Sequence, residues 1–115
     1  MTPPKFQKLV IYGVGLLGGS LGMALRRRGM AGRIVGLGRS MERLERARQL
    51  GAIDEGLTSP ADALAGADAL VLAIPPRQIR ERWEELASLI APDCFVTDVG
   101  SVKAAIVAQA EAALP

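Results

Sequence analysis

Three glycines near the start of the chain have the spacing of a phosphate-binding turn. Gly13, Gly15 and Gly18 form the pattern G-x-G-x-x-G between a short apolar run and a segment with helical leucine spacing. The first glycine permits a tight turn, the second lets the backbone approach a pyrophosphate, and the third lets the helix pack close to the strand. The free N–H groups at the helix start, around Leu16 and Leu17, would face the phosphates. The stretch predicts a dinucleotide site, and the alternative is a turn that binds nothing.

The turn after the second predicted strand bears on which dinucleotide is bound. Sites specific for NAD place an acidic residue there to accept hydrogen bonds from the ribose hydroxyls. Here Gly38 occupies that place and is followed by Arg39 and Ser40. Arginine offers a planar, permanently charged fork that can hold a 2′-phosphate. The turn therefore favours NADP over NAD, the alternative being an exposed Arg39 and an indifferent site.

Two further turns are expected at the same crevice. Strand four is expected to end in Ala73, Ile74 and Pro75, and strand five leads into a polar turn that contains Asp98, Gly100 and Ser101. Ligands of open α/β sheets bind at the carboxyl ends of the strands, here between strands one and four. The alternative for the last turn is a plain helix start in which Ser101 is the N-cap.

Apolar runs and helical patterns alternate along the chain, which predicts an α/β fold with a doubly wound parallel sheet of the Rossmann type. We expect a three-layer α/β/α sandwich with strand order 3-2-1-4-5. A face of Ile79, Trp83, Leu86 and Ile90 is expected to be buried. The expected strands are Lys8–Tyr12, Arg33–Leu37, Ile53–Leu57, Ala69–Ile74 and Phe95–Asp98, and the expected helices are Leu16–Arg28, Met41–Leu50, Pro60–Ala65, Pro76–Ile90 and an alanine-rich helix that begins near Ser101 and reaches the chain end.

Length and composition fit one dinucleotide-binding domain over residues 8–115, preceded by a flexible tail over 1–7. Half of the 115 residues are hydrophobic and 3% are aromatic. No apolar run is long enough to span a membrane, and the start of the chain is unlike a signal peptide. Cys94 is the single cysteine, so no internal disulfide is possible and we expect a small buried side chain in a cytoplasmic protein.

Positive charge is concentrated in the half that carries the glycine turn. Residues 1–50 hold ten basic and two acidic side chains, and the remainder holds four basic and ten acidic ones. This fits an anionic ligand. Nucleic acid is not expected as a partner, because no aromatic residues are interleaved for base stacking. Most arginines in 26–28 and 43–48 are expected on solvated helix faces, and no metal site is expected.

Four stretches together resemble the prephenate and arogenate dehydrogenases of tyrosine biosynthesis. They are the glycine turn with its Gly-Gly-Ser over residues 15–22, Leu-Gly-Ala-Ile-Asp over 50–54, Val-Leu-Ala-Ile-Pro over 71–75, and Thr-Asp-Val-Gly-Ser-Val-Lys over 97–103. The last is the most specific. The resemblance implies that a hydride passes from the ring carbon bearing the hydroxyl to NAD(P), while carbon dioxide leaves and the ring aromatises. It also implies that Ser101 lies near that hydroxyl and the nicotinamide.

Two features depart from that family. The family takes the hydroxyl proton with a histidine and binds prephenate or arogenate in a later helical domain, which also dimerises. This sequence has no histidine and ends at Pro115. We therefore expect the cofactor half of an enzyme that is inactive by itself and that forms a homodimer through the helical domain. The alternatives are a non-catalytic dinucleotide-sensing module and another Rossmann reductase, and the second is disfavoured by the two most distinctive turns.

Overall fold

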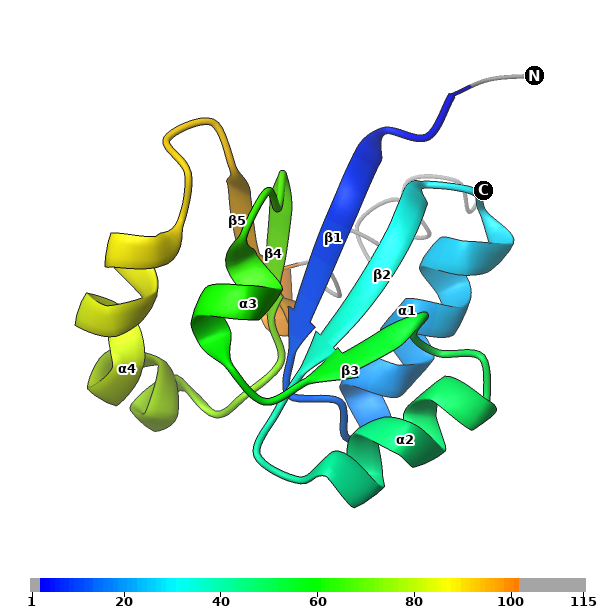
Figure 1. Ribbon diagram of the computed structural model, residues 1–115, viewed down its shortest axis with the longest axis horizontal. Helices are drawn as coiled ribbons and strands as arrows, with labels where there is room; N and C mark the ends of the chain where they lie inside the picture. Colours follow the sequence, from blue (N-terminus) through cyan, green and yellow to red (C-terminus); the bar gives the residue numbers. More distant parts are fainter. Residues whose placement is uncertain (1–2, 102–115) are drawn as a thin grey trace, which may run out of the picture.

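Strands and helices alternate through the whole part of the chain that the structure describes. The structure is a computed structural model that describes residues 3–101 (Figure 1). Its strands are β1 (Phe6–Tyr12), β2 (Ala31–Leu37), β3 (Glu55–Leu57), β4 (Ala69–Leu72) and β5 (Phe95–Asp98), and its helices are α1 (Leu16–Arg27), α2 (Met41–Gln49), α3 (Pro60–Leu64) and α4 (Pro76–Leu89).

The five strands form one parallel sheet in the order β3-β2-β1-β4-β5. This confirms the expected doubly wound α/β fold and its strand order. Tyr12 at the end of β1 lies in register with Leu37 of β2 and with Leu72 of β4. The carboxyl ends of these three central strands therefore meet at one edge, and the turns that follow them meet there too.

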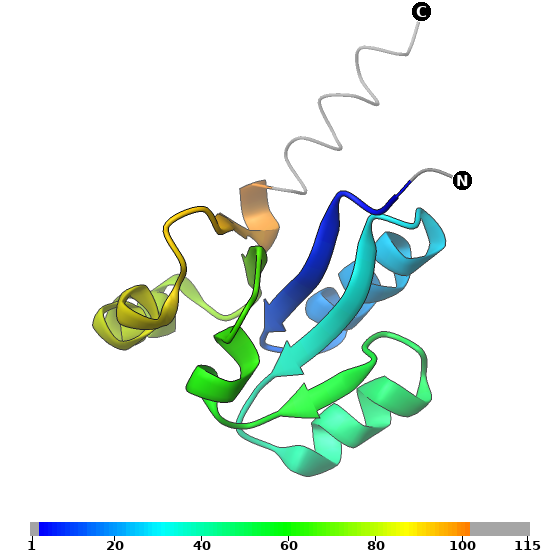
Figure 2. The ribbon, with the colours of Figure 1, turned by 45° about the horizontal axis from the view of Figure 1, so that its top comes forward.

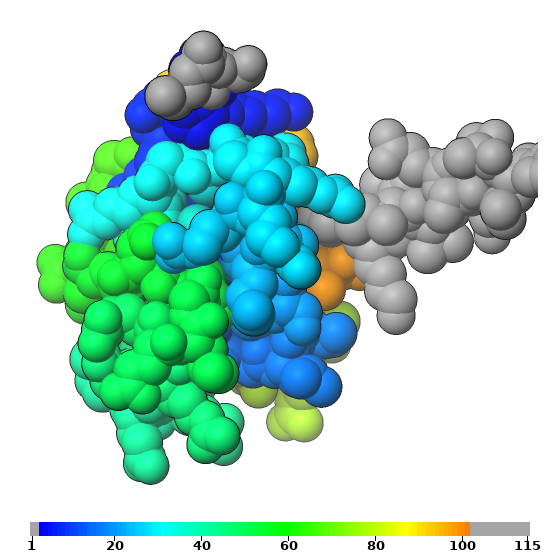
Figure 3. Space-filling view, turned by 90° about the vertical axis from the view of Figure 1, so that its right-hand side faces the viewer, coloured from blue at the N-terminus to red at the C-terminus, as the bar shows by residue number. Residues whose placement is uncertain are grey.

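Helices cover both faces of the sheet, as the turned view in Figure 2 shows, with α1 and α2 on one side and α3 and α4 on the other. Successive residues of β1 alternate between the two layers: Leu9 and Ile11 pack in the cluster under α2, and Val10 and Tyr12 pack with α3 and α4. Figure 3 looks onto the layer formed by α1 and α2, which lie side by side. The result is the expected three-layer sandwich.

Several boundaries differ from the expected ones. β1 begins at Phe6, inside the expected tail, because the Phe6 N–H donates to the carbonyl of Met30. β4 ends at Leu72, although the Ala73 N–H still donates to Tyr12 at 2.8 Å. The expected third strand keeps only Glu55–Leu57. Each change occurs where a turn begins or ends, and none moves an element in the sheet.

The burial of two side chains differs from the expectation. Trp83 on α4 is 43% exposed, whereas Leu86 on the same helix is fully buried. Cys94 is half-buried at the edge of the α4-side cluster, and burial raises the pKa of its thiol. Residues 99–101 begin a helix, and the rest of the alanine-rich helix expected there lies outside the described residues.

Candidate functional site

A cavity of about 290 Å³ lies at the carboxyl edge of the sheet, where the turns after β1, β2 and β4 meet. We call it the crevice. It contains eight of the expected cofactor-binding residues, Gly13, Gly15, Gly38, Arg39, Ser40, Ala73, Ile74 and Pro75, together with Tyr12, Val14, Arg43, Leu44 and Gln78. Residues up to 66 positions apart in sequence, Tyr12 and Gln78, thus surround one space, as the switch-point rule predicts.

Two glycines of the first turn are required by space and backbone conformation. Gly13 has φ +96°, and a Cβ there would lie 2.9 Å from the carbonyl oxygen of Ala73. A Cβ on Gly18 would lie 2.2 Å from the carbonyl oxygen of Gly13. The first glycine therefore makes the turn and brings it against β4, and the third lets α1 pack against the turn.

Gly15 differs from both, because a Cβ there would meet nothing within 4 Å. It is the N-cap of α1, and no side chain caps this helix end. The first N–H groups of α1 therefore have no intrahelical acceptor. The open space beside Gly15 and these free donors are the features that a pyrophosphate needs. Leu16 and Leu17, in the first turn, are 88% and 61% exposed.

The turn after β2 places Gly38, Arg39 and Ser40 at the crevice. A Cβ on Gly38 would make only ordinary contacts with Leu44, the nearest at 3.7 Å, so glycine here is not required by space. Ser40 is the N-cap of α2 and accepts a hydrogen bond from the Arg43 N–H at 3.2 Å. Its hydroxyl proton has no acceptor among residues 3–101 and can donate to a ligand.

The crevice is positively charged. Arg39 and Arg43 line it, and no aspartate or glutamate is among its described lining residues. Within residues 3–101 the ion pairs involve Arg26, Arg33, Arg48 and Arg77, so neither crevice arginine has an acidic partner there. An anion would find two cationic side chains uncommitted to other described groups.

The turn after β5 lies beside the crevice but does not line it. Asp98 is paired in register with Leu72, the residue before Ala73. Its carboxylate accepts two hydrogen bonds from Ser101, one from the N–H at 2.7 Å and one from the hydroxyl at 3.1 Å. Asp98 therefore caps the helix start at 99–101, and the reading of Ser101 as the N-cap is wrong. Gly100 lies between them and is exposed.

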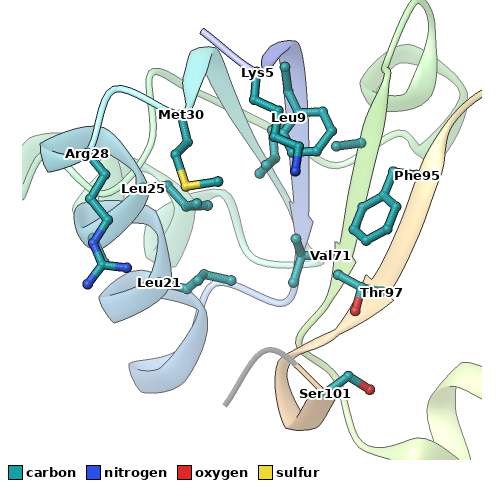
Figure 4. Close-up of a pocket in the computed structure, with 13 residues that line it drawn as sticks. Lys5, Leu9, Leu21, Leu25, Arg28, Met30, Val71, Phe95, Thr97 and Ser101 are labelled. Atoms are coloured by element: carbon teal, nitrogen blue, oxygen red, sulfur yellow. The ribbon is translucent and has the colours of Figure 1, made fainter. Parts of the chain in front are cut away.

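Ser101 instead lines a second cavity, of about 450 Å³, on the α1 side of the sheet. Figure 4 shows Leu21 and Leu25 of α1 on one side of this space, Phe95 and Thr97 of β5 on the other, and Val71 between them. Its lining is mainly apolar and it carries no carboxylate among the described residues. This apolar surface differs in character from the charged crevice.

The Leu-Gly-Ala-Ile-Asp stretch has a structural role. The Asp54 carboxylate accepts hydrogen bonds from the Ile34 N–H at 2.7 Å and from the Arg26 side chain at 2.6 Å. Burial opposes ionisation, but these two bonds outweigh it, so the pKa of Asp54 lies below its usual value. Asp54 therefore ties the segment before β3 to β2 and α1.

Sequence reasoning missed Tyr12, Val14, Leu44 and Gln78, and it assigned Arg43 to a solvated face. The first two adjoin the glycine turn and could have been included by proximity. Among the described residues no cluster of histidine, cysteine or acidic side chains could hold a metal ion, and none of the helices is long and apolar enough to cross a membrane.

Comparison with known proteins identifies relatives over most of the chain. The family model described as "Prephenate dehydrogenase, nucleotide-binding domain" matches residues 21–115. A prephenate dehydrogenase of Bacillus subtilis is 35% identical over 108 residues, which cover 93% of this chain and 29% of that protein. The chain thus spans less than a third of this relative.

Two solved structures are similar as well. The prephenate dehydrogenase of A. aeolicus, in complex with hydroxyphenyl propionate and NAD+, has a TM-score of 0.73 and 39% identity, covering 80% of this chain and 32% of that one. The arogenate dehydrogenase of Synechocystis has a TM-score of 0.72 and 32% identity, with the same two coverages.

Proposed function

We propose that this chain, which belongs to the family of prephenate dehydrogenase nucleotide-binding domains, forms the cofactor-binding part of a prephenate or arogenate dehydrogenase. The observation that carries the proposal is the crevice, in which the turns after three strands surround one space. It has uncapped backbone donors at the start of α1 and two arginines without an acidic partner among residues 3–101. The family match supplies the reaction class. The reaction belongs to tyrosine biosynthesis, and with a single cysteine we propose a cytoplasmic protein.

The proposed arrangement of the dinucleotide follows the order of the turns. The pyrophosphate would lie against Gly15 and the N–H groups of Leu16 and Leu17. The adenosine ribose would lie against Gly38, Arg39 and Ser40. The nicotinamide would extend past Ala73, Ile74 and Pro75 toward Asp98, Gly100 and Ser101, since Asp98 is the last residue of β5, the strand next to β4. When bound, the nicotinamide supplies the hydride acceptor of an oxidative decarboxylation.

We propose NADP as the preferred cofactor, with NAD as the alternative. Two features support this. No carboxylate follows β2 to repel a 2′-phosphate, and Arg39 lines the crevice without an acidic partner among residues 3–101. Ser40 retains a free hydroxyl proton at the same turn. Together they offer a charged fork and a neutral donor to a phosphate.

Ser101 is proposed to orient the substrate hydroxyl. Its own proton is directed to Asp98, so its lone pairs are free to accept a hydrogen bond. The 115 residues contain no histidine, so the group that takes the hydroxyl proton in the family has no counterpart here. We propose that this group, the substrate pocket for prephenate or arogenate, and a homodimer contact belong to the part of the relatives that this chain does not span. A second candidate is a dinucleotide-sensing module, because the turns around the crevice could bind a dinucleotide without catalysing a reaction.

Calorimetric titration with NADPH and with NADH tests the cofactor proposal. We expect tighter binding of NADPH. Arg39→Ala should weaken the binding of NADPH by about 1.5–3 kcal/mol and leave the binding of NADH nearly unchanged. Arg80 is an exposed arginine on α4, and Arg80→Ala should change the binding of neither cofactor. Equal binding of the two cofactors by the unmodified protein would refute the preference. Oxidation of prephenate or arogenate by the protein that continues beyond these residues separates the enzyme from the sensing module.

A further inference from the structure

Arg43 lies where a second positive charge would contact the cofactor. It is the third residue of α2, and it lines the crevice together with Gly38, Arg39 and Ser40. Helical arginines of this segment are ordinarily solvated, as the sequence suggested for 43–48. The crevice distinguishes Arg43 from the other arginines of the helix, because Arg46 and Arg48 do not line it.

The backbone of Arg43 is fixed to the same turn that carries Arg39. Its N–H donates to the Ser40 hydroxyl oxygen at 3.2 Å, and the Ser40 carbonyl accepts from the Leu44 N–H at 3.0 Å. The two arginine side chains therefore start from a short, hydrogen-bonded stretch and reach one cavity. Such an anchored pair loses less conformational freedom on binding than two arginines on separate loops would.

Arg43 has no ion-pair partner among the described residues, although Glu42 precedes it in the first turn of α2. On the same helix Arg48 pairs with Glu45, whereas Arg43 forms no ion pair with residues 3–101. The described lining residues of the crevice include no acid. Two guanidinium groups at one cavity repel each other until an anion lies between them. A phosphate monoester carries nearly two negative charges at neutral pH and has three acceptor oxygens, enough for both.

We infer that Arg43 is a specificity-determining residue that clamps the ribose 2′-phosphate of NADP(H) together with Arg39. The inference rests on the proposed dinucleotide site and extends it to a residue that the turn pattern alone did not indicate. Arg43 also lines a neighbouring cavity that contains Gly15 and Leu16. The competing role is therefore a contact with the pyrophosphate, which NADP and NAD share.

Three variants of α2 separate these roles. We expect Arg43→Ala to weaken NADPH binding by about tenfold or more, as for a lost charge-assisted hydrogen bond, and to leave NADH binding unchanged. The affinity of Arg43→Lys for NADPH should lie between those of the unmodified protein and Arg43→Ala, because lysine keeps the charge and lacks the planar fork. Arg48→Ala, which removes an equal charge on the same helix from a residue that lines neither cavity, should alter the binding of neither cofactor. The readout is calorimetric affinity, with circular dichroism to confirm folding.

Two fragments of the cofactor sharpen the test. Adenosine 2′,5′-bisphosphate carries the phosphate that distinguishes NADP, and 5′-AMP lacks it. If Arg43→Ala binds the bisphosphate more weakly than the unmodified protein does but binds 5′-AMP with unchanged affinity, the inference is supported. Equal loss of NADPH and NADH would assign Arg43 to the pyrophosphate, and no loss of either would assign it to solvent; both results overturn the inference. If the unmodified protein itself binds the two cofactors equally, the NADP proposal fails first and independently of Arg43.

Discussion

Gly38→Asp should reverse the cofactor preference. The substitution restores the acid that NAD-specific sites carry after the second strand. The backbone can accept it, because Gly38 is not among the glycines with positive φ, and a Cβ would lie 3.7 Å from Leu44 Cδ2. The variant is therefore expected to fold, which would not hold for the same change at Gly13.

The magnitude follows from two opposing changes at one place. A new carboxylate would repel the 2′-phosphate and compete with it for Arg39. Each charge-assisted hydrogen bond that the phosphate loses costs about 1.5–3 kcal/mol of binding free energy. The same carboxylate would accept hydrogen bonds from the ribose hydroxyls of NADH, with a gain of similar size. At the lower end of both ranges the ratio of the two dissociation constants shifts by about 3 kcal/mol, or roughly a hundredfold.

The assay is a pair of calorimetric titrations on the variant, the unmodified protein and Gly38→Ala. The alanine variant adds the Cβ without the charge, so it should keep the original preference for NADPH. Thermal unfolding of all three proteins verifies that the fold is retained. A folded Gly38→Asp protein with an unchanged affinity ratio would show that the ribose does not lie at this turn, and the reasoning from the β2 turn would be refuted.

Three other substitutions test separate parts of the site. Gly15→Val should fold, since its Cβ has open space and φ is −89°. It should bind neither cofactor, because the side chain would occupy the place of the pyrophosphate. A folded variant that binds NADPH with unchanged affinity would show that the phosphates lie elsewhere. Asp54→Asn should lower the midpoint of thermal unfolding at pH 7, and the difference should vanish as pH falls below about 3.8, because the lowered pKa of Asp54 gives stability only while the carboxylate is ionised. A gap that persists at low pH would contradict this. In a longer protein that includes these residues, Ser101→Ala should reduce the turnover rate by less than the 10²–10⁴-fold typical of losing a general base. Its affinity for NADPH should stay nearly intact. An unchanged turnover rate would leave Ser101 without a role in orientation.

The fold could be predicted because its signals are local and agree with one another. The apolar runs at Leu9–Ile11 and Ala69–Leu72 are buried on both faces, and Gly13 must bend the chain between a strand and a helix. Strand order then follows from handedness rules rather than from side-chain detail. Trp83 was mispredicted because helical periodicity gives a face but not its width: Leu86 lies at the centre of the α4 contact, and Trp83 lies at its margin.

The residues that line the crevice could be predicted where a turn at a strand end marks them, and most clearly at the glycine turn. Gly13, Gly15 and Gly18 have a fixed spacing, and each has a steric or spatial reason visible in the structure. Arg43 carries no such mark, since arginines at helical spacing are usually solvated. α2 packs against the sheet through Leu44, which adjoins Gly56 of β3, and in this orientation Arg43 lines the crevice. A residue whose role depends on such an orientation cannot be recognised from its neighbours in sequence.

The pairing of Asp98 with Ser101 would allow one turn both to begin a helix and to position the substrate hydroxyl, as we propose for Ser101. Because Asp98 accepts both donors of Ser101, the serine has no free proton and presents only lone pairs. A hydroxyl that donates to this oxygen is oriented but not deprotonated, since Asp98 already uses its carboxylate to hold the turn. We therefore expect orientation and proton removal to be assigned to different residues, with Ser101 performing the first and a group outside these 115 residues the second. This division is consistent with a chain that contains the binding turns and no histidine.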